Sequence, residues 1–416
     1  MKRRIVITGM GIVSPIGVGR EKFWSSLAGG VSGIREISLF DTSELNCKTA
    51  GEIPDFNPGA IIGDKGMRSL DRSAKLVCSA ARLAVTDAQL EMSESIRSRA
   101  GVVIGTTRSY LHSFASTDRK LLQEGFLSLK PMDFPSTIPN VAAGHVSLML
   151  GAEGFNTTLS GEASSLDAIN FGASFIRMGR VDVALAGGVE SLSLDSFLEF
   201  YLAGSLAGSR GGGPEICAPF DRRRNGPVLG EASAVVVLED YEHARARGAK
   251  IYAEVLGFGS SFDPKAASQG SASQGSASEG SAKAIVASMK KALDSSGLSP
   301  RDIDYVSANA NSSLAADLAE SVAIKRVFGE SLDRLHVSAI KSMTAESFGA
   351  GGVLQACASS LAIGENIVPP TINCLEKDTD CNIPIVDRTL SARIDTVMIN
   401  SFGESGMTSS LVIARA

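Results

Sequence analysis

The chain has 416 residues, 44% of them hydrophobic and 20% charged, and its formal net charge is −5 at pH 7. Because this length exceeds the usual size of one hydrophobic core, we expect two core-forming units. The acidic balance provides no basic field for nucleic acid or for anionic lipid, so neither is expected as a partner.

The N-terminal segment, "MKRRIVITGMGIVSPIGVG", places basic residues before an apolar stretch, as a signal peptide does. Gly9, Gly11, Pro15 and Gly17 interrupt that stretch, however, and no small-residue cleavage pattern follows it. We therefore predict a buried first strand that runs into a glycine turn. No apolar run approaches the length of a transmembrane helix, which predicts a soluble, cytoplasmic protein without membrane contact.

Two helix–strand units echo each other along the chain. One begins "SAKLVCSAARLAV" at Ser73 and the other "SAKAIVASMKKAL" at Ser281, and each continues through a polar link to a short buried strand, "AGVVIG" or "DYVSAN". The apolar residues of each helix recur at a spacing of three to four. The echo suggests a duplicated α/β unit, although helix–strand units also recur by chance in any α/β protein.

Residues 157–175, "TTLSGEASSLDAINFGASF", predict a short strand, a tight Gly/Ser turn and a nearly all-apolar helix. This layout presents a nucleophile at the start of a buried helix, but the residue at the apex is Glu162 and not cysteine or serine. Farther on, "VDVALAGGVES" and "ASAVVVLED" predict central strands of a covered sheet, and "DTVMINSFGESGMTSSLVIA" predicts two strands around a glycine-rich turn. Alternating strands and helices indicate a layered α/β fold.

Between the two units lies "SQGSASQGSASEGSA", residues 268–282, in which a pentad occurs three times. Small polar residues bury little apolar surface, so we predict a flexible, solvated insertion; a gating role beside a pocket is the alternative. The six cysteines are scattered without a CxxC pair, and the four histidines do not cluster with acids or cysteines. We expect buried free thiols in a reducing compartment, and neither a metal site nor a cofactor.

A family resemblance is carried by segments spread over almost the whole chain. They are "VITGMGIVSPIG", "PSTIPNVAAGHVSLMLG", "GRVDVALAGGVES", "PFDRRRNGPVLGEASAVVVLED", "KSMTAESFGAGG" and "NSFGESG". Together they resemble the β-ketoacyl synthases, the condensing enzymes of fatty-acid and type II polyketide synthesis. The resemblance implies a thiolase-like α/β fold with duplicated α/β halves in a layered αβαβα arrangement. It also implies an N-terminal half, 1–250, and a C-terminal half, 251–416.

Condensing enzymes of this family use one cysteine and two histidines. The cysteine takes the acyl chain as a thioester at a helix N-terminus, and the histidines assist decarboxylation of malonyl and stabilise the enolate. The resemblance places Glu162 at the cysteine position, Asn309 at the first histidine position and Glu346 at the second. Lys341 nearby matches the family pattern, and Glu404 in "NSFGESG" stands where a gating Phe is usual.

Each replacement works against condensation. A carboxylate at Glu162 is a weak nucleophile and would form a labile mixed anhydride. Glu346 would repel the malonyl carboxylate and the enolate, and Asn309 donates a hydrogen bond but cannot shuttle a proton near neutral pH. Relatives that replace only the cysteine, by glutamine, retain decarboxylation, but they keep the histidines. We therefore expect no catalytic residue in this chain and no condensation by the chain alone.

Three acids, Glu162, Glu346 and Glu404, are predicted to converge on one former cavity. Like charges that close cannot all ionise cheaply, so at least one should have a raised pKa or pair with a base such as Lys341. We interpret them as a salt-bridged plug in an inactive pocket. A new acid/base site is the alternative, because perturbed carboxylates also mark function.

The leading functional hypothesis comes from the same resemblance. Type II polyketide systems pair an active ketosynthase with an inactive homologue, the chain length factor or ketosynthase β subunit, which lacks the cysteine as this chain does. We therefore predict a pseudoenzyme that forms a heterodimer with an active ketosynthase and shapes the tunnel for acyl and malonyl chains of acyl carrier protein. The heterodimer would be a β-ketoacyl-ACP synthase, an acyltransferase of polyketide biosynthesis.

The segment "KPMDFPSTIPN" resembles, by position, the one that crosses the dimer interface of the family. Met132, Asp133 and Phe134 are therefore candidate partner contacts, and Phe134 as a core residue is an equally open interpretation. Two other functions also stay open. One is an acyl-thioester hydrolase or lyase that uses Glu162 and Glu346, and the other is a scaffold homodimer that binds acyl carrier protein without reacting.

Overall fold

A computed structural model describes residues 3–66, 70–211, 213–264, 278–403 and 405–416. Most of the pentad repeat, residues 268–277, lies outside this range, as does Glu404, so the predictions made for both stay untested there. At its C-terminal end the repeat is not a loop, because helix α11 (Ser278–Ser296) already begins within it. Buried apolar residues such as Ala282, Ile285 and Met289 anchor that helix in the core, and this packing outweighs the low helix propensity of the Ser and Gly residues in its first turn.

The described residues form one 11-stranded sheet, with ten strands in two mirrored halves and the short β2 (Gly17–Val18) paired with β1. The order in the first half is β1 (Ile5–Ser14), β8 (Ala232–Asp240), β7 (Val183–Glu190), β5 (Ala100–Thr106) and β6 (Asn156–Ser160). The order in the second half is β9 (Ala253–Phe262), β15 (Met407–Ala414), β14 (Thr396–Phe402), β10 (Tyr305–Ser307) and β11 (His336–Ser338). In each half the first three strands of this order are antiparallel and the remaining neighbours are parallel.

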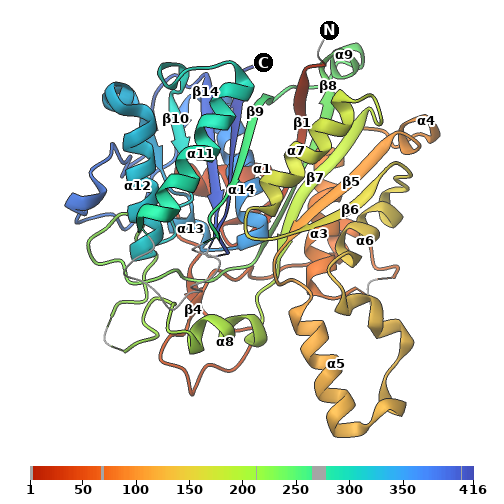
Figure 1. Cartoon of the computed structure of the whole chain (residues 1–416). Coiled ribbons are helices and arrows are strands. Elements are labelled where there is room, and N and C mark those ends of the chain that lie inside the picture. Colours follow the sequence, from red (N-terminus) through yellow and green to blue (C-terminus); the bar gives the residue numbers. More distant parts are fainter. Residues whose placement is uncertain (1–2, 67–69, 212, 265–277, 404) are drawn as a thin grey trace.

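The two halves of the sheet meet where β1 pairs with β9, over Val6 with Glu254 and Ile7 with Ala253. Figure 1 shows the halves side by side, with the blue-green C-terminal half on the left and the orange and yellow N-terminal half on the right. The predicted thiolase-like fold with duplicated α/β halves is confirmed. The division at residues 250 and 251 stays a prediction.

Helices form three layers: one between the two halves of the sheet, and one on the outer face of each half. The central apolar cluster contains α7 (Ser164–Arg177) and α14 (Gly351–Glu365) packed on the inner faces of both halves. One outer cluster contains α3 (Arg72–Asp87) and α6 (Val141–Leu150), and the other contains α11 and α12 (Leu314–Phe328). Neighbouring strand residues point to opposite clusters, as Met398 and Ile399 do, so both faces of the sheet are covered.

The glycines of the first strand have a role that the sequence did not reveal. The predicted buried strand is β1, which continues through Gly9 and Gly11 to Ser14, and a turn then leads into Gly17. A Cβ on Gly11 would overlap the Ala80 carbonyl oxygen of α3. The glycines therefore let a helix backbone lie directly on the strand.

A helical arm projects from the N-terminal half at the lower right of Figure 1. It consists of α5 (Leu111–Glu124) followed by the 3-10 segments Phe126–Ser128 and Pro131–Thr137, and α5 has no buried residue. The remaining elements are short. They are α1 (Arg20–Ala28), α2 (Gly59–Ile62), α4 (Glu94–Arg97), α8 (Leu194–Leu202), α9 (Tyr241–Ala246), α13 (Lys341–Thr344), β2 (Gly17–Val18) and the pairs β3–β4 (Arg35–Glu36, Thr49–Ala50) and β12–β13 (Ile367–Val368, Leu390–Ser391).

All six cysteines are free and buried, as predicted. In the part of the chain that the structure describes, no group of three or more His, Cys, Asp or Glu side chains could hold a metal ion. Within the same residues, each helix is too short or too polar to cross a membrane.

Candidate functional site

The strand, turn and helix predicted for residues 157–175 are present. β6 ends at Ser160, Gly161 follows with φ +140°, and α7 begins at Ser164. Glu162 lies in this turn, which we call the elbow (residues 160–164), and its side chain is buried. The positive φ favours glycine before the apex, so the chain turns sharply from strand to helix.

Glu162 is held by the loop between β14 and β15. Its Oε2 accepts hydrogen bonds from the Ser405 amide at 2.9 Å and from Ser405 Oγ at 2.7 Å. A Cβ on Gly403 would overlap the Glu162 carboxylate. The loop and the acid therefore fit each other closely only because residue 403 is glycine.

The side chain of Lys341 connects Asn309 and Glu346, the other two positions that the sequence predicted. Its Nζ lies 2.8 Å from Asn309 Oδ1 and 2.8 Å from Glu346 Oε2, and all three side chains are buried. Glu346 also accepts from Asn311 Nδ2 at 2.8 Å and from the Phe348 amide at 2.8 Å. A buried ion pair persists only where further hydrogen bonds satisfy its oxygens, and this one has them.

The elbow and the Lys341 cluster are connected through one strand end. The Phe402 amide donates to Asn309 Oδ1 at 3.3 Å, and the residue after it, Gly403, touches Glu162. The structure thus brings Glu162, Asn309, Lys341 and Glu346 to adjoining places. Glu162 and Glu346 have different hydrogen-bond partners, and Glu404 lies outside the described residues.

A buried carboxylate that sequence reasoning missed supports Asn309. Glu320 on α12 accepts from the backbone amides of Asn309 and Ala310, each at 2.9 Å, and from Asn400 Nδ2 at 3.0 Å. Burial raises the pKa of Glu320 to about 7, and those hydrogen bonds act in the opposite direction. Glu320 therefore fixes the backbone that carries Asn309.

A second missed carboxylate, Glu190, lies at the end of β7. It accepts from the amides of Thr107 at 3.0 Å, Arg108 at 2.7 Å and Gly349 at 3.3 Å. Burial raises its pKa to about 7. Glu190 joins the end of β5 to the segment after Glu346, and the only sequence signal for it was an acid directly after an apolar strand.

Asn311 is positioned by a third buried acid. Its amide donates to Asp317 Oδ1 at 3.0 Å, and the Phe220 amide donates to Asp317 Oδ2 at 2.9 Å. Burial raises the pKa of Asp317 to about 6, against the attraction of Arg224. The polar site is therefore surrounded by acids that hold backbone amides.

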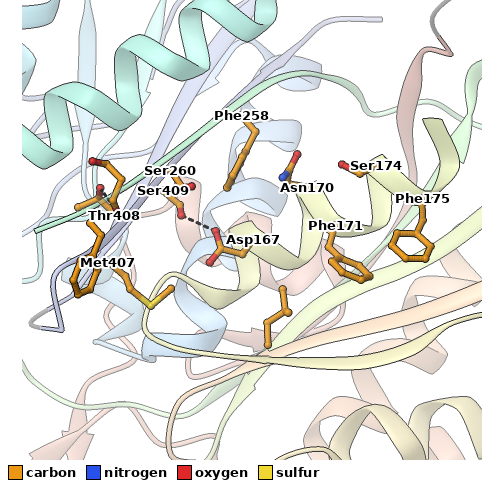
Figure 2. Close-up of a pocket in the computed structure, with 13 residues that line it drawn as sticks. Asp167, Asn170, Phe171, Ser174, Phe175, Phe258, Ser260, Met407, Thr408 and Ser409 are labelled. Atoms are coloured by element: carbon orange, nitrogen blue, oxygen red, sulfur yellow. Dashed lines mark hydrogen bonds between the residues drawn. The ribbon is translucent and has the colours of Figure 1, made fainter. Parts of the chain in front are cut away.

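The other side of α7 faces an open groove of about 570 Å³. Figure 2 shows Asp167, Phe171 and Phe175 on α7 opposite Phe258 of β9 and Ser409 of β15. Ser409 Oγ donates to Asp167 Oδ1 at 2.6 Å, and burial raises the pKa of Asp167. The sequence did not predict this groove.

The candidate partner contacts lie apart from the elbow, on the arm. Met132 is 75% exposed and Phe134 is 66% exposed, and both line a groove with Asp133 and residues of α5. Phe134 is therefore not a core residue of this chain, which removes one of the two interpretations made for it.

Two family models match the chain. The model described as "Beta-ketoacyl synthase, N-terminal domain" matches residues 2–244, and "Beta-ketoacyl synthase, C-terminal domain" matches residues 252–375. The chain belongs to the β-ketoacyl synthase family.

Its relatives match over their whole length. A "3-oxoacyl-[acyl-carrier-protein] synthase 2" of Coxiella burnetii (strain RSA 493 / Nine Mile phase I) is 36% identical over 417 residues, covering 100% of this chain and 99% of the relative. A protein of the same name from Staphylococcus aureus (strain COL) is 35% identical over 421 residues, covering 99% of this chain and 98% of the relative.

Two solved structures are similar over 100% of both chains. One, described as "The ishigamide ketosynthase/chain length factor", has a TM-score of 0.90 and 33% identity. The other, a type II PKS acyl-carrier protein in complex with its ketosynthase bound to the hexaketide, has a TM-score of 0.88 and 29% identity.

The predicted function is wrong. We expected a non-catalytic chain-length-factor subunit, but the curated relatives that match the whole chain are named as 3-oxoacyl-[acyl-carrier-protein] synthases. The hydrolase or lyase and the scaffold homodimer fit no better, since neither of these relatives is named so. The prediction rested on a few side chains, whereas the similarity extends over every element of the fold.

Proposed function

We propose that this chain takes part in the elongation of acyl chains on acyl carrier protein, the type of reaction for which its curated relatives are named. The observation that carries the proposal is the elbow, because it places one side chain at the start of a buried helix beside the Lys341 cluster. The chain's own contribution is to bind the acyl group that the carrier delivers.

The residues at the elbow limit the chemistry that this proposal includes. Glu162, Asn309 and Glu346 stand, on this proposal, where a condensing enzyme has its cysteine and two histidines. Glu162 accepts two hydrogen bonds from Ser405, and Glu346 is paired with Lys341, so neither carboxylate is poised to attack a thioester.

The arm supports contact with a second ketosynthase chain as part of this proposal. Met132 and Phe134 are exposed apolar side chains next to Asp133, and exposed apolar surface of this kind is typical of interaction sites. A structure described as a ketosynthase/chain length factor and one with an acyl-carrier protein are among the similar solved structures. The six buried free thiols fit a reducing compartment, so a cytoplasmic location belongs to the same proposal.

Binding and elongation can be tested separately. The full chain is mixed with octanoyl-acyl carrier protein, alone and together with a ketosynthase that retains its cysteine and histidines. We expect binding by the chain alone, no octanoyl adduct on Glu162 by intact mass, and more 3-oxoacyl product from malonyl-acyl carrier protein with both chains present than with the other ketosynthase alone. Lack of binding to the carrier, or an adduct on Glu162, would contradict the proposal.

A pair of matched variants tests the partner contact. Phe134→Ser should weaken co-elution of the two chains in size-exclusion chromatography. Leu375→Ser, which changes an even more exposed apolar residue in the C-terminal half, should not. Equal effects of the two variants would remove the arm from the proposed interface.

A further inference from the structure

Arg108 lies next to the elbow, although no motif drew attention to it. It follows β5, and its amide donates to Glu190 Oε1 at 2.7 Å. Thr107 Oγ1, one residue before it, donates to the Gly161 carbonyl at 3.1 Å. The backbone of Arg108 is therefore attached to the turn that carries Glu162.

The guanidinium of Arg108 is fixed on one side. Nε lies 2.7 Å from Glu199 Oε2, and Nη2 lies 2.9 Å from Glu199 Oε1. The carbon of the guanidinium lies 4.7 Å from the ring centroid of Phe200 and 5.3 Å from that of Phe348. These two rings stack on each other at 4.9 Å. The two hydrogen bonds to Glu199 and the contact with the two rings therefore hold the guanidinium in one orientation.

The remaining nitrogen of this guanidinium is buried and unsatisfied. Nη1 makes no hydrogen bond to any residue that the structure describes, whereas Glu199 on the other side is 48% exposed in its side chain. Buried donors of native proteins nearly always have a partner, and each exception calls for an explanation. Here the donor without a partner is Arg108 Nη1, and Arg108 is near enough to Glu162 of the elbow to feel its charge.

We propose that Arg108 is a specificity-determining residue whose Nη1 donates a hydrogen bond to a ketone oxygen of the bound acyl chain, so that oxoacyl chains are preferred over saturated ones. The inference rests on the proposed function and adds the substrate class to it. Phe348 is only partly buried and offers apolar surface for the hydrocarbon part of such a chain, and the buried Phe200 ring stacks on it.

A neutral oxygen suits this donor better than a carboxylate. Glu199 already balances the charge of Arg108, and Glu162 and Glu190 are close enough to act on it electrostatically. A carboxylate on the ligand would be repelled by these acids, whereas a ketone only accepts a hydrogen bond. A saturated chain would leave Nη1 desolvated without a partner, and sites of this kind discriminate strongly against the analogue that lacks the acceptor.

The experiment uses the full-length chain and acyl-pantetheine amides, which cannot be transferred. Octanoyl, the isomeric oxooctanoyl groups and 7-carboxyheptanoyl are compared by calorimetry. We expect at least one oxooctanoyl amide to bind about tenfold more tightly than octanoyl, as one hydrogen bond to a charged donor gives. The carboxylate is expected to bind no better than octanoyl.

Arg108→Met keeps an unbranched, flexible side chain and removes the donor. It should bring the oxooctanoyl preference to about one while octanoyl still binds. Arg99→Met is the matched control, because Arg99 makes the same two-nitrogen pair with Asp182 at the opposite end of β5 and should leave the preference intact.

Several outcomes overturn the inference. Equal binding of octanoyl and all oxooctanoyl isomers by the unmodified chain does so without any variant, and so does a preference that survives in Arg108→Met. Preference for the carboxylate would replace a ketone by an acid as the ligand and contradict it as well. If no acyl amide and no acyl carrier protein bind, the proposed function fails and the inference fails with it.

Discussion

Lys341 Nζ lies 2.8 Å from Glu346 Oε2, and both side chains are buried. The charge of each therefore depends on the other. Lys341→Met should lower the free energy of unfolding by about 3–5 kcal/mol, because it leaves a buried carboxylate without its cation. Urea unfolding of the variant and the unmodified chain measures the difference.

The same pair allows an internal control. Glu346→Gln in the Lys341→Met chain removes the uncompensated charge and should restore a large part of the lost stability. The exposed pair of Lys377 and Asp387, at 3.1 Å, is the external control, and Lys377→Met should cost less than about 1 kcal/mol. A double variant no more stable than Lys341→Met would show that the charge is not the cause.

Glu162→Cys should place a reactive thiol at the elbow. The start of α7 favours a thiolate, whereas burial raises the pKa of the native thiols, for example to about 12 for Cys78 and about 11 for Cys47. Brief treatment of the folded variant with iodoacetamide should therefore label residue 162 well before any native cysteine. Peptide mass spectrometry reads this out.

The unmodified chain under the same treatment is the control, and all six of its cysteines are buried. Labelling of native cysteines at the rate of residue 162 would mean that access, and not the elbow, decides reactivity.

Gly403→Ala should destabilise the chain by about 1–3 kcal/mol, because the new methyl group overlaps the Glu162 carboxylate. Thermal and urea unfolding measure the effect. Gly364→Ala is the comparison, as a Cβ there has nothing within 4 Å and the residue lies in α14.

The cause of the Gly403→Ala effect is tested by a second change. Glu162→Ala in that background removes the overlapping group and should recover most of the loss. If Gly403→Ala is equally destabilising with and without Glu162, the overlap with backbone or with another side chain is responsible.

The buried acids Glu190 and Glu320 make stability depend on pH. Burial raises the pKa of each from 4.5 to about 7, so the folded chain holds protons there that the unfolded chain has already lost. Their contribution is fully present below about pH 4.5 and is lost as pH rises through about 7. The free energy of unfolding should therefore decrease between pH 5 and pH 8, by an amount on the order of a few kcal/mol.

Glu320→Gln isolates one of these contributions. The amide has the same shape but does not titrate, so the decrease between about pH 5 and pH 8 should become smaller. Urea unfolding at several pH values gives the slope. An unchanged slope would assign the pH dependence to other groups.

The sequence was sufficient for the fold because its strands are strongly apolar and its segments match a family from end to end. It also located Glu162, Asn309, Lys341 and Glu346, which the structure brings to adjoining places through Phe402. The packing of a helix backbone on Gly11 of β1 was missed, since the sequence does not show which element lies against a strand glycine.

The supporting residues could not be predicted for a related reason. Glu320 and Arg108 belong to stretches in which a charged residue is normally solvated, and only the fold buries Glu320 among three donors or leaves Arg108 Nη1 without one. The function was predicted wrongly because side-chain identities at a site say which chemistry is hindered there, and not which process the whole protein serves.

The junction between β1 and β9 is a final consequence of the duplicated fold. Only two residue pairs join the halves there, whereas β1 and β8 pair along most of their length. Hydrogen bonds of the sheet therefore contribute little to the coupling of the two halves. Cooperative unfolding depends instead on α7 and α14, whose shared apolar centre must be lost before either half can open on its own.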